Sequence, residues 1–190
     1  MQKIRKVTLA LCCAALCQTA NAADYFQIGL GGASVGFVGS SSLSSTSTHY
    51  DTNKAALKIG GASTTQNMYI TGGLTVIGFE GQDKIYTLDL ATHFFAAPSF
   101  YVGGVIGYQE YKYDNASMMS SIGATSSKFD FNGLTAGISV GGLLFYDNVD
   151  VNLTYRFVNG RSASITSATG SADIEIERIV QLSISRNIML

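Results

Sequence analysis

Seven ionisable residues fall at polar positions in stretches where polar and aliphatic residues alternate. Side chains of this kind can form a buried network of ion pairs, because an unpaired buried charge is costly. They can also line a gated or proton-sensitive pore. We favour the ion-pair network and keep the pore as the alternative. The seven residues are Lys58, Asp89, His93, Asp150, Arg156, Glu175 and Glu177.

A second candidate for chemistry is His49, which is followed by Tyr50 and Asp51 and lies close to Ser47. Histidine is the most frequent general acid or base in enzymes. The surrounding segment is rich in Ser and Thr, however, so neighbouring polar residues are more typical of a plain loop than of a catalytic site. With only two histidines, the chain also offers little for a metal site. We expect no enzyme, no cofactor and no metal.

The elements that position these residues are eight stretches of alternating aliphatic and small or polar residues, as expected of β-strands with two different faces. Residues 149–159 show the alternation most clearly: Val149, Val151 and Leu153 are separated by Asp150 and Asn152. Short turns follow the second, fourth and sixth stretches, and long Ser-rich loops follow the first, fifth and seventh. The predicted strands are 25–37, 55–61, 68–79, 84–94, 100–113, 128–145, 149–159 and 172–190, and the predicted long loops are 39–54, 114–127 and 160–171.

Aromatic residues gather at the ends of these stretches, with aliphatic residues between them. This distribution is typical of the aromatic girdles of a transmembrane β-barrel. The rings in question are Phe79, Tyr86, Phe94, Phe95, Phe100, Tyr101, Tyr108, Tyr111, Tyr113, Phe129, Phe131, Phe145 and Tyr146.

The first 22 residues have the features of a signal peptide. Lys3, Arg5 and Lys6 precede the apolar run 7–17, which is too short to span a membrane as a helix. Ala20 and Ala22 provide a small-x-small cleavage pattern, so we expect a mature domain of residues 23–190. All three cysteines lie in the first segment, and the mature chain therefore has no thiol for a disulfide or a metal.

The charge of the mature chain argues against nucleic acid as a partner. Removal of Lys3, Arg5 and Lys6 leaves 9 basic against 13 acidic residues, a net charge of −4. Only 13% of the residues are charged, whereas a soluble surface carries about 25–35%. A chain with few charges and no spanning helix can be stable in lipid as a closed barrel.

The sequence therefore predicts an all-β fold: an eight-stranded, antiparallel, up-and-down transmembrane β-barrel. The non-aliphatic face consists of Gly, Ser, Thr, Asn and Gln, which suits the narrow interior of such a barrel, so we assign the aliphatic face to lipid. A soluble lipocalin-like carrier, with the faces exchanged, is the alternative. Arg178 and Arg186 then fall on the outer face. Arg186 would lie near the periplasmic interface, or a bulge would shift the phase of its strand. Arg178 would be a solvated rim charge or would meet lipopolysaccharide phosphates.

Two segments carry a resemblance to a known group. Residues 149–157 resemble the penultimate strand of small outer-membrane barrels of the opacity-protein and OmpA-like type. Residues 183–190 are similar to the C-terminal signal read by the barrel assembly machinery, with Ser185 in place of glycine and Ile188 and Leu190 in place of aromatics. The resemblance implies outer-membrane lipid and lipopolysaccharide as surroundings and the assembly machinery as a partner during insertion.

These features lead to a functional expectation with two alternatives. We expect a structural or adhesin-like surface protein of the bacterial outer membrane, whose extracellular loops meet a host or surface ligand. The first alternative is a narrow channel or porin for ions or small solutes. The remote alternative is a lipid A-modifying enzyme centred on His49, because lipid A palmitoyltransferases of similar size place a catalytic histidine in the first extracellular region.

Overall fold

A computed structural model describes residues 23–41, 44–65, 67–80, 83–114, 128–160, 163–167 and 170–190. The predicted signal peptide and most of the predicted loop 114–127 lie outside these residues. The described chain contains no helix long and apolar enough to cross a membrane. The strands are β1 (Ala23–Ser41), β2 (Ser44–Thr64), β3 (Met68–Ile77), β4 (Asp83–Ala97), β5 (Phe100–Asp114), β6 (Lys128–Leu144), β7 (Val149–Gly160), β8 (Ala163–Ser167) and β9 (Gly170–Met189).

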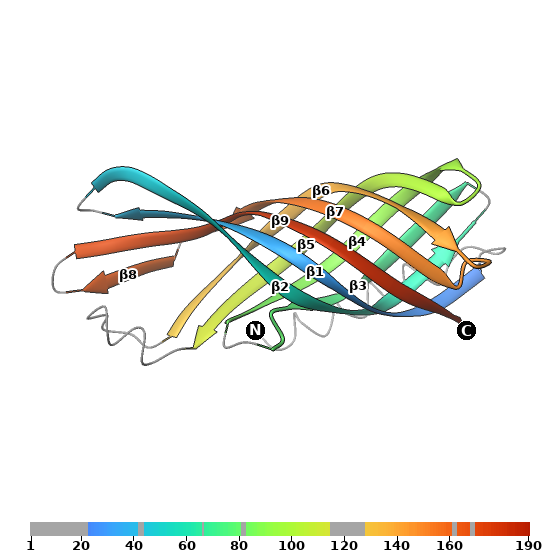
Figure 1. Ribbon diagram of the computed structural model, residues 1–190, viewed down its shortest axis with the longest axis horizontal. Coiled ribbons are helices and arrows are strands. Elements are labelled where there is room, and N and C mark those ends of the chain that lie inside the picture. The colour runs from blue at the N-terminus through green and yellow to red at the C-terminus, as the bar shows by residue number, and fades with distance from the viewer. Residues whose placement is uncertain are drawn as a thin grey trace.

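Eight of these strands close into an antiparallel barrel, which confirms the predicted fold class. Neighbours pair in the order β1 to β7 and then β9, and β9 pairs back with β1. The short strand β8 pairs only with β9 and lies outside the cylinder. Figure 1 shows the start of β1 and the end of β9 at one end of the barrel, opposite β8.

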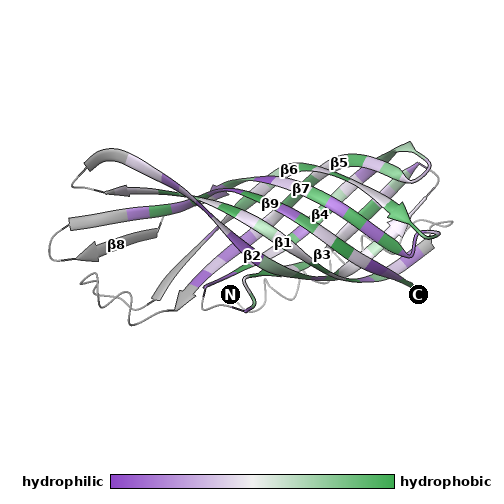
Figure 2. Cartoon of the chain, viewed as in Figure 1, coloured by the Kyte–Doolittle hydropathy of each residue, from purple (hydrophilic) through white to green (hydrophobic). Residues whose placement is uncertain are grey.

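Strand alternation sorts the side chains as predicted, with aliphatic residues outward and polar residues inward. Leu30, Ile106 and Leu134 are each more than 60% exposed, whereas Gln27 and Gln109 are fully buried inside the barrel. Figure 2 shows green and purple residues alternating along the barrel strands. The soluble alternative, with the aliphatic face inward, is therefore wrong for this chain.

The interior has three layers along the barrel axis. One mouth, near the β3–β4 turn, is filled by a cluster that includes Val35, Phe37, Ile77, Ile85 and Ile179. The opposite end, where the strands connect through short turns, is filled by a second cluster. Its members are Tyr25, Ala62, Tyr69, Tyr101 and Leu143. Hydrogen-bonded polar residues lie between the two clusters.

The first predicted loop, 39–54, is wrong, because most of it is strand. β2 begins at Ser44 and not near residue 55, and it pairs with β1 as far as Ser41. The Ser- and Thr-rich composition resembles a loop, but threonine fits a pleated strand well. The other edge of β1 pairs with β9, and this pairing supports the β1–β2 hairpin. The local sequence does not reveal this support.

A β-bulge in β9 reverses the facing of its residues near the mouth that lies by the β3–β4 turn. Gly36 of β1 pairs with Arg178, but the next residue, Phe37, pairs with Ile176, so Glu177 is the extra residue. Ile179 therefore faces inward below the bulge, and Ile176 faces inward above it. Strict alternation had placed Ile176 outward.

Three of the predicted girdle rings face the interior of the barrel: Tyr101, Tyr111 and the partly buried Phe95, which packs against Tyr101. Tyr101 is fully buried and Tyr111 is 6% exposed, and each belongs to one of the interior clusters. Phe94, Phe100, Tyr108 and Phe145 remain on the outside. The side chains of the predicted girdle residues Tyr113, Phe129 and Phe131 lie outside the described part.

Candidate functional site

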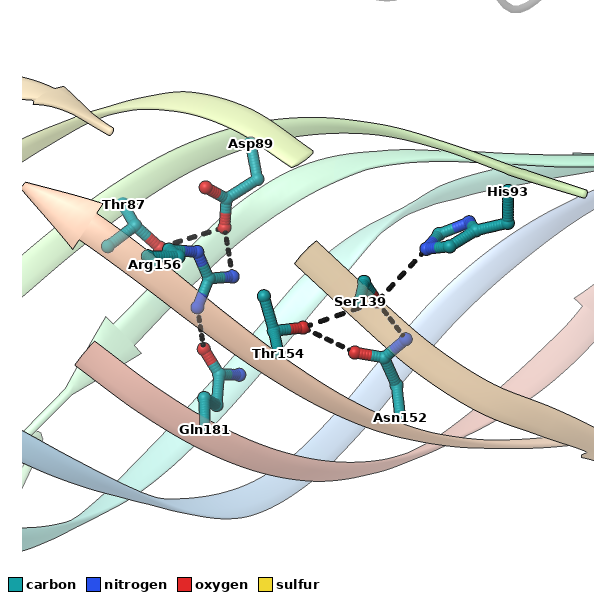
Figure 3. A network of polar contacts seen from close by, with 8 residues as sticks. All are labelled: Thr87, Asp89, His93, Ser139, Asn152, Thr154, Arg156 and Gln181. Atoms are coloured by element: carbon teal, nitrogen blue, oxygen red, sulfur yellow. Dashed lines mark hydrogen bonds and ion pairs between the residues drawn. The ribbon is translucent and has the colours of Figure 1, made fainter. Parts of the chain in front are cut away.

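The centre of the barrel holds a charged pair that spans the lumen. Arg156 of β7 donates from Nη2 to Oδ2 of Asp89 on β4 over 2.7 Å, and from Nη1 to Oε1 of Gln181 on β9 over 3.0 Å. Thr87 donates to the same Asp89 oxygen over 3.2 Å. Three separate strands therefore converge on one guanidinium (Figure 3). The side chains of Arg156 and Asp89 are 5% and 13% exposed, so this pair is shielded from bulk water.

A second, neutral network lies beside this pair. His93 Nδ1 is 3.0 Å from the carbonyl oxygen of Tyr69, and Nε2 is 3.0 Å from Ser139 Oγ. Because a carbonyl oxygen only accepts, Nδ1 carries the proton and Nε2 accepts from Ser139. Asn152 donates to the same Ser139 oxygen over 2.7 Å, and Thr154 donates to Asn152 (Figure 3). His93 is thus held as a neutral imidazole with both nitrogens occupied.

Asp150 is the centre of a third group, near the end of the barrel with the short turns. It is 1% exposed and accepts hydrogen bonds from the hydroxyls of Tyr101 and Tyr69. Gln27 donates to it over 3.2 Å and also donates to Asn187 over 2.8 Å. Neutral donors from β1, β3 and β5 therefore solvate this carboxylate in place of water.

Lys58 completes the set of interior charges. It interacts electrostatically with Asp150 and Asp89, so two basic and two acidic side chains balance among the described interior residues. Lys58, Asp89, His93 and Arg156 line a cavity of about 20 Å³. That space suits a single water molecule. Asp89 Oδ1 and Arg156 Nε have no protein partner and are suitable groups to bind it.

Five of the seven predicted interior residues lie inside the barrel: Lys58, Asp89, His93, Asp150 and Arg156. The interior position expected for Glu175 and Glu177 is wrong, because both are exposed on the outer face. The bulge in β9 is the physical reason, since its extra residue shifts the facing of the residues that precede it by one position relative to those that follow it. Aliphatic and polar residues alternate on both sides of Glu177, so the sequence gives no local sign of the bulge.

Most interior partners of these residues were not singled out from the sequence. These residues are neutral. Their position on the polar, inward-facing side of each alternating strand was the one feature of the sequence that could have identified them. They are Gln27, Tyr69, Tyr101, Ser139, Asn152, Thr154, Gln181 and Asn187.

The two apolar clusters close the polar centre from both ends. At one mouth the Phe37 ring packs edge-on against Tyr111, with centroids 5.7 Å apart. At the other end Tyr69 and Tyr101 lie 5.2 Å apart, and Phe95 packs edge-on against Tyr101 at 6.4 Å. Gly141 lies against the cluster of Tyr69 and Tyr101, and a Cβ at Gly141 would be 2.5 Å from the Tyr101 hydroxyl oxygen. The polar centre of the described interior is therefore enclosed by packed side chains at both ends.

Beyond the barrel mouth, four strands continue as an antiparallel sheet. We call it the projecting sheet; it consists of residues 36–41 of β1, 44–55 of β2, β8, and 170–178 of β9. The last pairing of β2 with β3 is at Ala56, so twelve residues of β2 extend past the barrel wall. Figure 1 shows these strands leaving one side of the mouth, at the left of the view.

An ionic cluster covers the outer face at the base of the projecting sheet. Arg178 donates from Nη2 to both carboxylate oxygens of Asp51 over 3.1 Å. The two side chains meet across Gly36, where a Cβ would lie only 2.8 Å from Arg178 Cγ. Arg178 Nη1 is also 3.5 Å from Glu177. Arg178 is thus a paired rim charge.

His49 belongs to the same cluster. Its Nδ1 lies 3.6 Å from Oε2 of Glu177, and its side chain is 60% exposed. No hydrogen bond joins it to a hydroxyl group among the described residues. Within the described chain, no group of three or more His, Cys, Asp or Glu residues is arranged to hold a metal ion.

No protein-family model matches the chain, and no curated protein matches its sequence. Solved structures do match its fold. Ail, the attachment invasion locus protein of Yersinia pestis, crystallised with the heparin analogue sucrose octasulfate, is 12% identical with a TM-score of 0.51. The match covers 86% of this chain and 99% of Ail. The outer membrane protein OprG from Pseudomonas aeruginosa is 16% identical with a TM-score of 0.51, over 88% of this chain and 97% of OprG. The chain thus has the fold of small eight-stranded outer-membrane barrels.

Proposed function

We propose that this protein is an integral outer-membrane barrel that acts through its projecting sheet as a surface-interaction, adhesin-like module. The observation that carries the proposal is the contrast between the two parts of the molecule. The barrel interior is filled and closed at both ends, whereas four strands extend beyond the mouth into the space outside. Packed side chains at both ends of the interior disfavour the passage of a solute, and the projecting sheet offers a surface outside the barrel for a partner.

The outward aliphatic residues support the membrane placement. Leu134, Ile138 and Ile106 are each more than 60% exposed, a surface that hydrocarbon stabilises and water does not. The end with the short turns, where β1 starts and β9 ends, would face the periplasm, because short turns of such barrels are periplasmic. The projecting sheet would then face outward. Lipid and lipopolysaccharide would surround the barrel, and the barrel assembly machinery would insert it after removal of residues 1–22.

The charge of the projecting sheet limits its partner. Among its described residues, four are acidic and two are basic, and the two basic residues, Lys54 and Arg178, are both in ion pairs. Such a surface repels a polyanion and suits a neutral or basic ligand. The heparin analogue bound by Ail is a polyanion, so adhesion by this chain would use a different ligand chemistry.

A channel is the second candidate, and the water-sized cavity is the only observation that favours it. Its lining includes Lys58, Asp89 and Arg156, which would interact with a passing ion. A path would have to open through two packed aromatic and aliphatic clusters. The channel is therefore less well supported than the surface role.

The lipid A-modifying enzyme centred on His49 remains the remote alternative. The carboxylate of Glu177 could orient the imidazole, but the contact is long and exposed. We expect His49→Ala to leave the lipid A profile unchanged in mass spectrometry of whole membranes. A lipid A species that disappears in this variant, and returns with the wild-type gene, would favour the enzyme.

A hairpin deletion tests the surface role. Phe37 and Tyr50 are paired, so an Asn-Gly turn joining them replaces residues 38–49 and leaves the parts of β1 and β2 within the barrel wall unchanged. Cells with the wild-type protein should adhere to amine-coated glass or epithelial monolayers more than to heparin-coated glass, and the deletion should lose this adhesion. Tyr146→Ser, in the exposed turn at the other end, is the control. Equal adhesion of the deletion and the wild type to every surface would contradict the proposal.

A further inference from the structure

Arg186 occupies an unusual position on the outer surface of the barrel. It lies in the outward phase of β9 between Ile184 and Ile188, which are 56% and 46% exposed. Across the neighbouring strands it pairs with Ile28 of β1 and Val149 of β7. A cation is therefore surrounded by the aliphatic residues that face lipid.

No residue of the described chain pairs with the Arg186 side chain by a hydrogen bond or an ion pair. This contrasts with Arg178, which binds Asp51, and with Arg156, which binds Asp89. An unpaired arginine on a lipid-facing surface costs about 2–4 kcal/mol at the bilayer midplane and much less near an interface. A counter-ion for Arg186 would then come from outside the described chain.

The height of Arg186 on the barrel identifies the membrane leaflet. It pairs with Val149, the first residue of β7, directly after the turn at Phe145–Asn148. The next residue, Asn187, donates from its side chain to the carbonyl of Asp147 over 2.7 Å. Arg186 thus lies level with a short turn at the end of the barrel where β1 starts and β9 ends, which is the periplasmic end in the proposed placement.

A hollow in the outer wall begins at Arg186. It has a volume of about 490 Å³, within the range of small-molecule sites, and its walls are almost entirely apolar. Its side chains are Ile28, Leu30, Leu57, Val149, Ile184 and Arg186. Ile184 and Leu30 pair with each other one step farther from the periplasmic end, so the hollow extends from the charge toward the bilayer centre.

We propose that this hollow binds one glycerophospholipid of the periplasmic leaflet, with its phosphate on Arg186 and an acyl chain along Leu30, Leu57 and Ile184. The guanidinium matches a phosphate in charge and in the geometry of its donors. Lipopolysaccharide belongs to the opposite leaflet and does not reach this height. The inference rests on the proposed membrane placement of the barrel.

Native mass spectrometry of the folded, detergent-purified barrel with phosphatidylglycerol tests the site. We expect one preferred lipid adduct, and about fivefold weaker binding in Arg186→Gln, which corresponds to about 1 kcal/mol. Arg186→Lys should keep part of the affinity. Leu30→Trp should weaken binding by filling the hollow, whereas Ile106→Trp, equally bulky and outward, should not. Diacylglycerol, which lacks the phosphate, should bind the wild type as weakly as it binds Arg186→Gln.

The outcomes separate this inference from the proposed function. Equal phosphatidylglycerol binding by the wild type and Arg186→Gln, or equal weakening by Leu30→Trp and Ile106→Trp, would overturn the lipid site and leave the barrel proposal intact. Equal binding of diacylglycerol and phosphatidylglycerol by the wild type would overturn the role of the phosphate. A processed protein that stays monodisperse in water without detergent would overturn both proposals. Heat-modifiability on gels verifies that each variant is folded.

Discussion

Arg156 on β7 and Asp89 on β4 meet inside the barrel, with Nη2 of the guanidinium 2.7 Å from Oδ2 of the carboxylate. The two strands are separated by β5 and β6 in the sheet order, so the contact joins distant parts of the wall through the lumen. Gln181 of β9 holds the second guanidinium nitrogen. One buried side chain therefore braces three strands of the cylinder.

We predict that Asp89→Asn destabilises the barrel by about 3 kcal/mol, because it leaves Arg156 buried without a counter-charge. Thr87→Val, which removes one hydroxyl hydrogen bond to the same carboxylate, should cost about 1.5 kcal/mol. Urea titration of the folded barrel in lipid vesicles, followed by the heat-modifiable band, measures both values. If Asp89→Asn costs no more than Thr87→Val, the pair does not brace the barrel.

Conductance measurements test the closure of the interior. In planar bilayers the wild-type barrel should give no reproducible openings, because Phe37 and Tyr111 fill one mouth while Tyr69 and Tyr101 fill the other. A large porin reconstituted in the same way verifies that insertion is detected. Discrete, repeatable current steps from the wild-type protein would show that a path opens through these clusters, and the channel would become the better function.

Deletion of Glu177 should be tolerated, because it is the extra residue of the bulge in β9. Without it, Ile176 and Ile179 still face inward and Arg178 still faces outward, and the register with β1 becomes regular. Deletion of Gln181 in the same strand should instead abolish the folded band, since a one-residue slip exchanges the two faces. Similar folded yields of the two deletion variants would mean that the bulge does not set the facing of β9.

The turn between β3 and β4 should depend on pH through Glu80. Its carboxylate accepts the amide hydrogens of Glu80 and of Ala55, the latter over 3.1 Å, and these bonds lower its pKa below the ordinary value. The bonds stabilise the turn while Glu80 is ionised, so this contribution is lost as the pH falls below 4.5. Below pH 4.5, hydrogen exchange at the Ala55 amide should become faster in the wild type relative to the same amide in the Glu80→Gln variant. Identical pH profiles for the two proteins would exclude this role.

The barrel itself could be predicted from the sequence because its signal is repeated in every strand. Alternation along residues 149–159, for example, places Val151 and Leu153 on one face and Asn152 and Thr154 on the other, as the structure does. The small number of charged residues on the polar face then indicated that this face lines the interior of the barrel. Sheet closure follows from the need to pair every backbone group in lipid.

The parts that could not be predicted depend on contacts between distant residues. β2 is long because its Ser- and Thr-rich half pairs with β1, which in turn pairs with β9. The bulge at Glu177 depends on the register of β9 against Gly36 and Phe37. Tyr101 lies inside and Phe100 outside, although both looked like girdle rings, because only the exact strand phase separates them.

The orientation of the two faces is the central claim, and the absence of tryptophan from the chain makes it directly measurable. Single tryptophans placed at Phe100 and at Tyr101, adjacent residues of β5, differ only in the face that they occupy. Lipids brominated in their acyl chains should quench the fluorescence of Phe100→Trp and of Ile138→Trp, and should leave that of Tyr101→Trp and of the exposed Glu175→Trp unchanged. Quenching of Tyr101→Trp in place of Phe100→Trp, or of none of the four, would contradict a barrel with its aliphatic face in lipid.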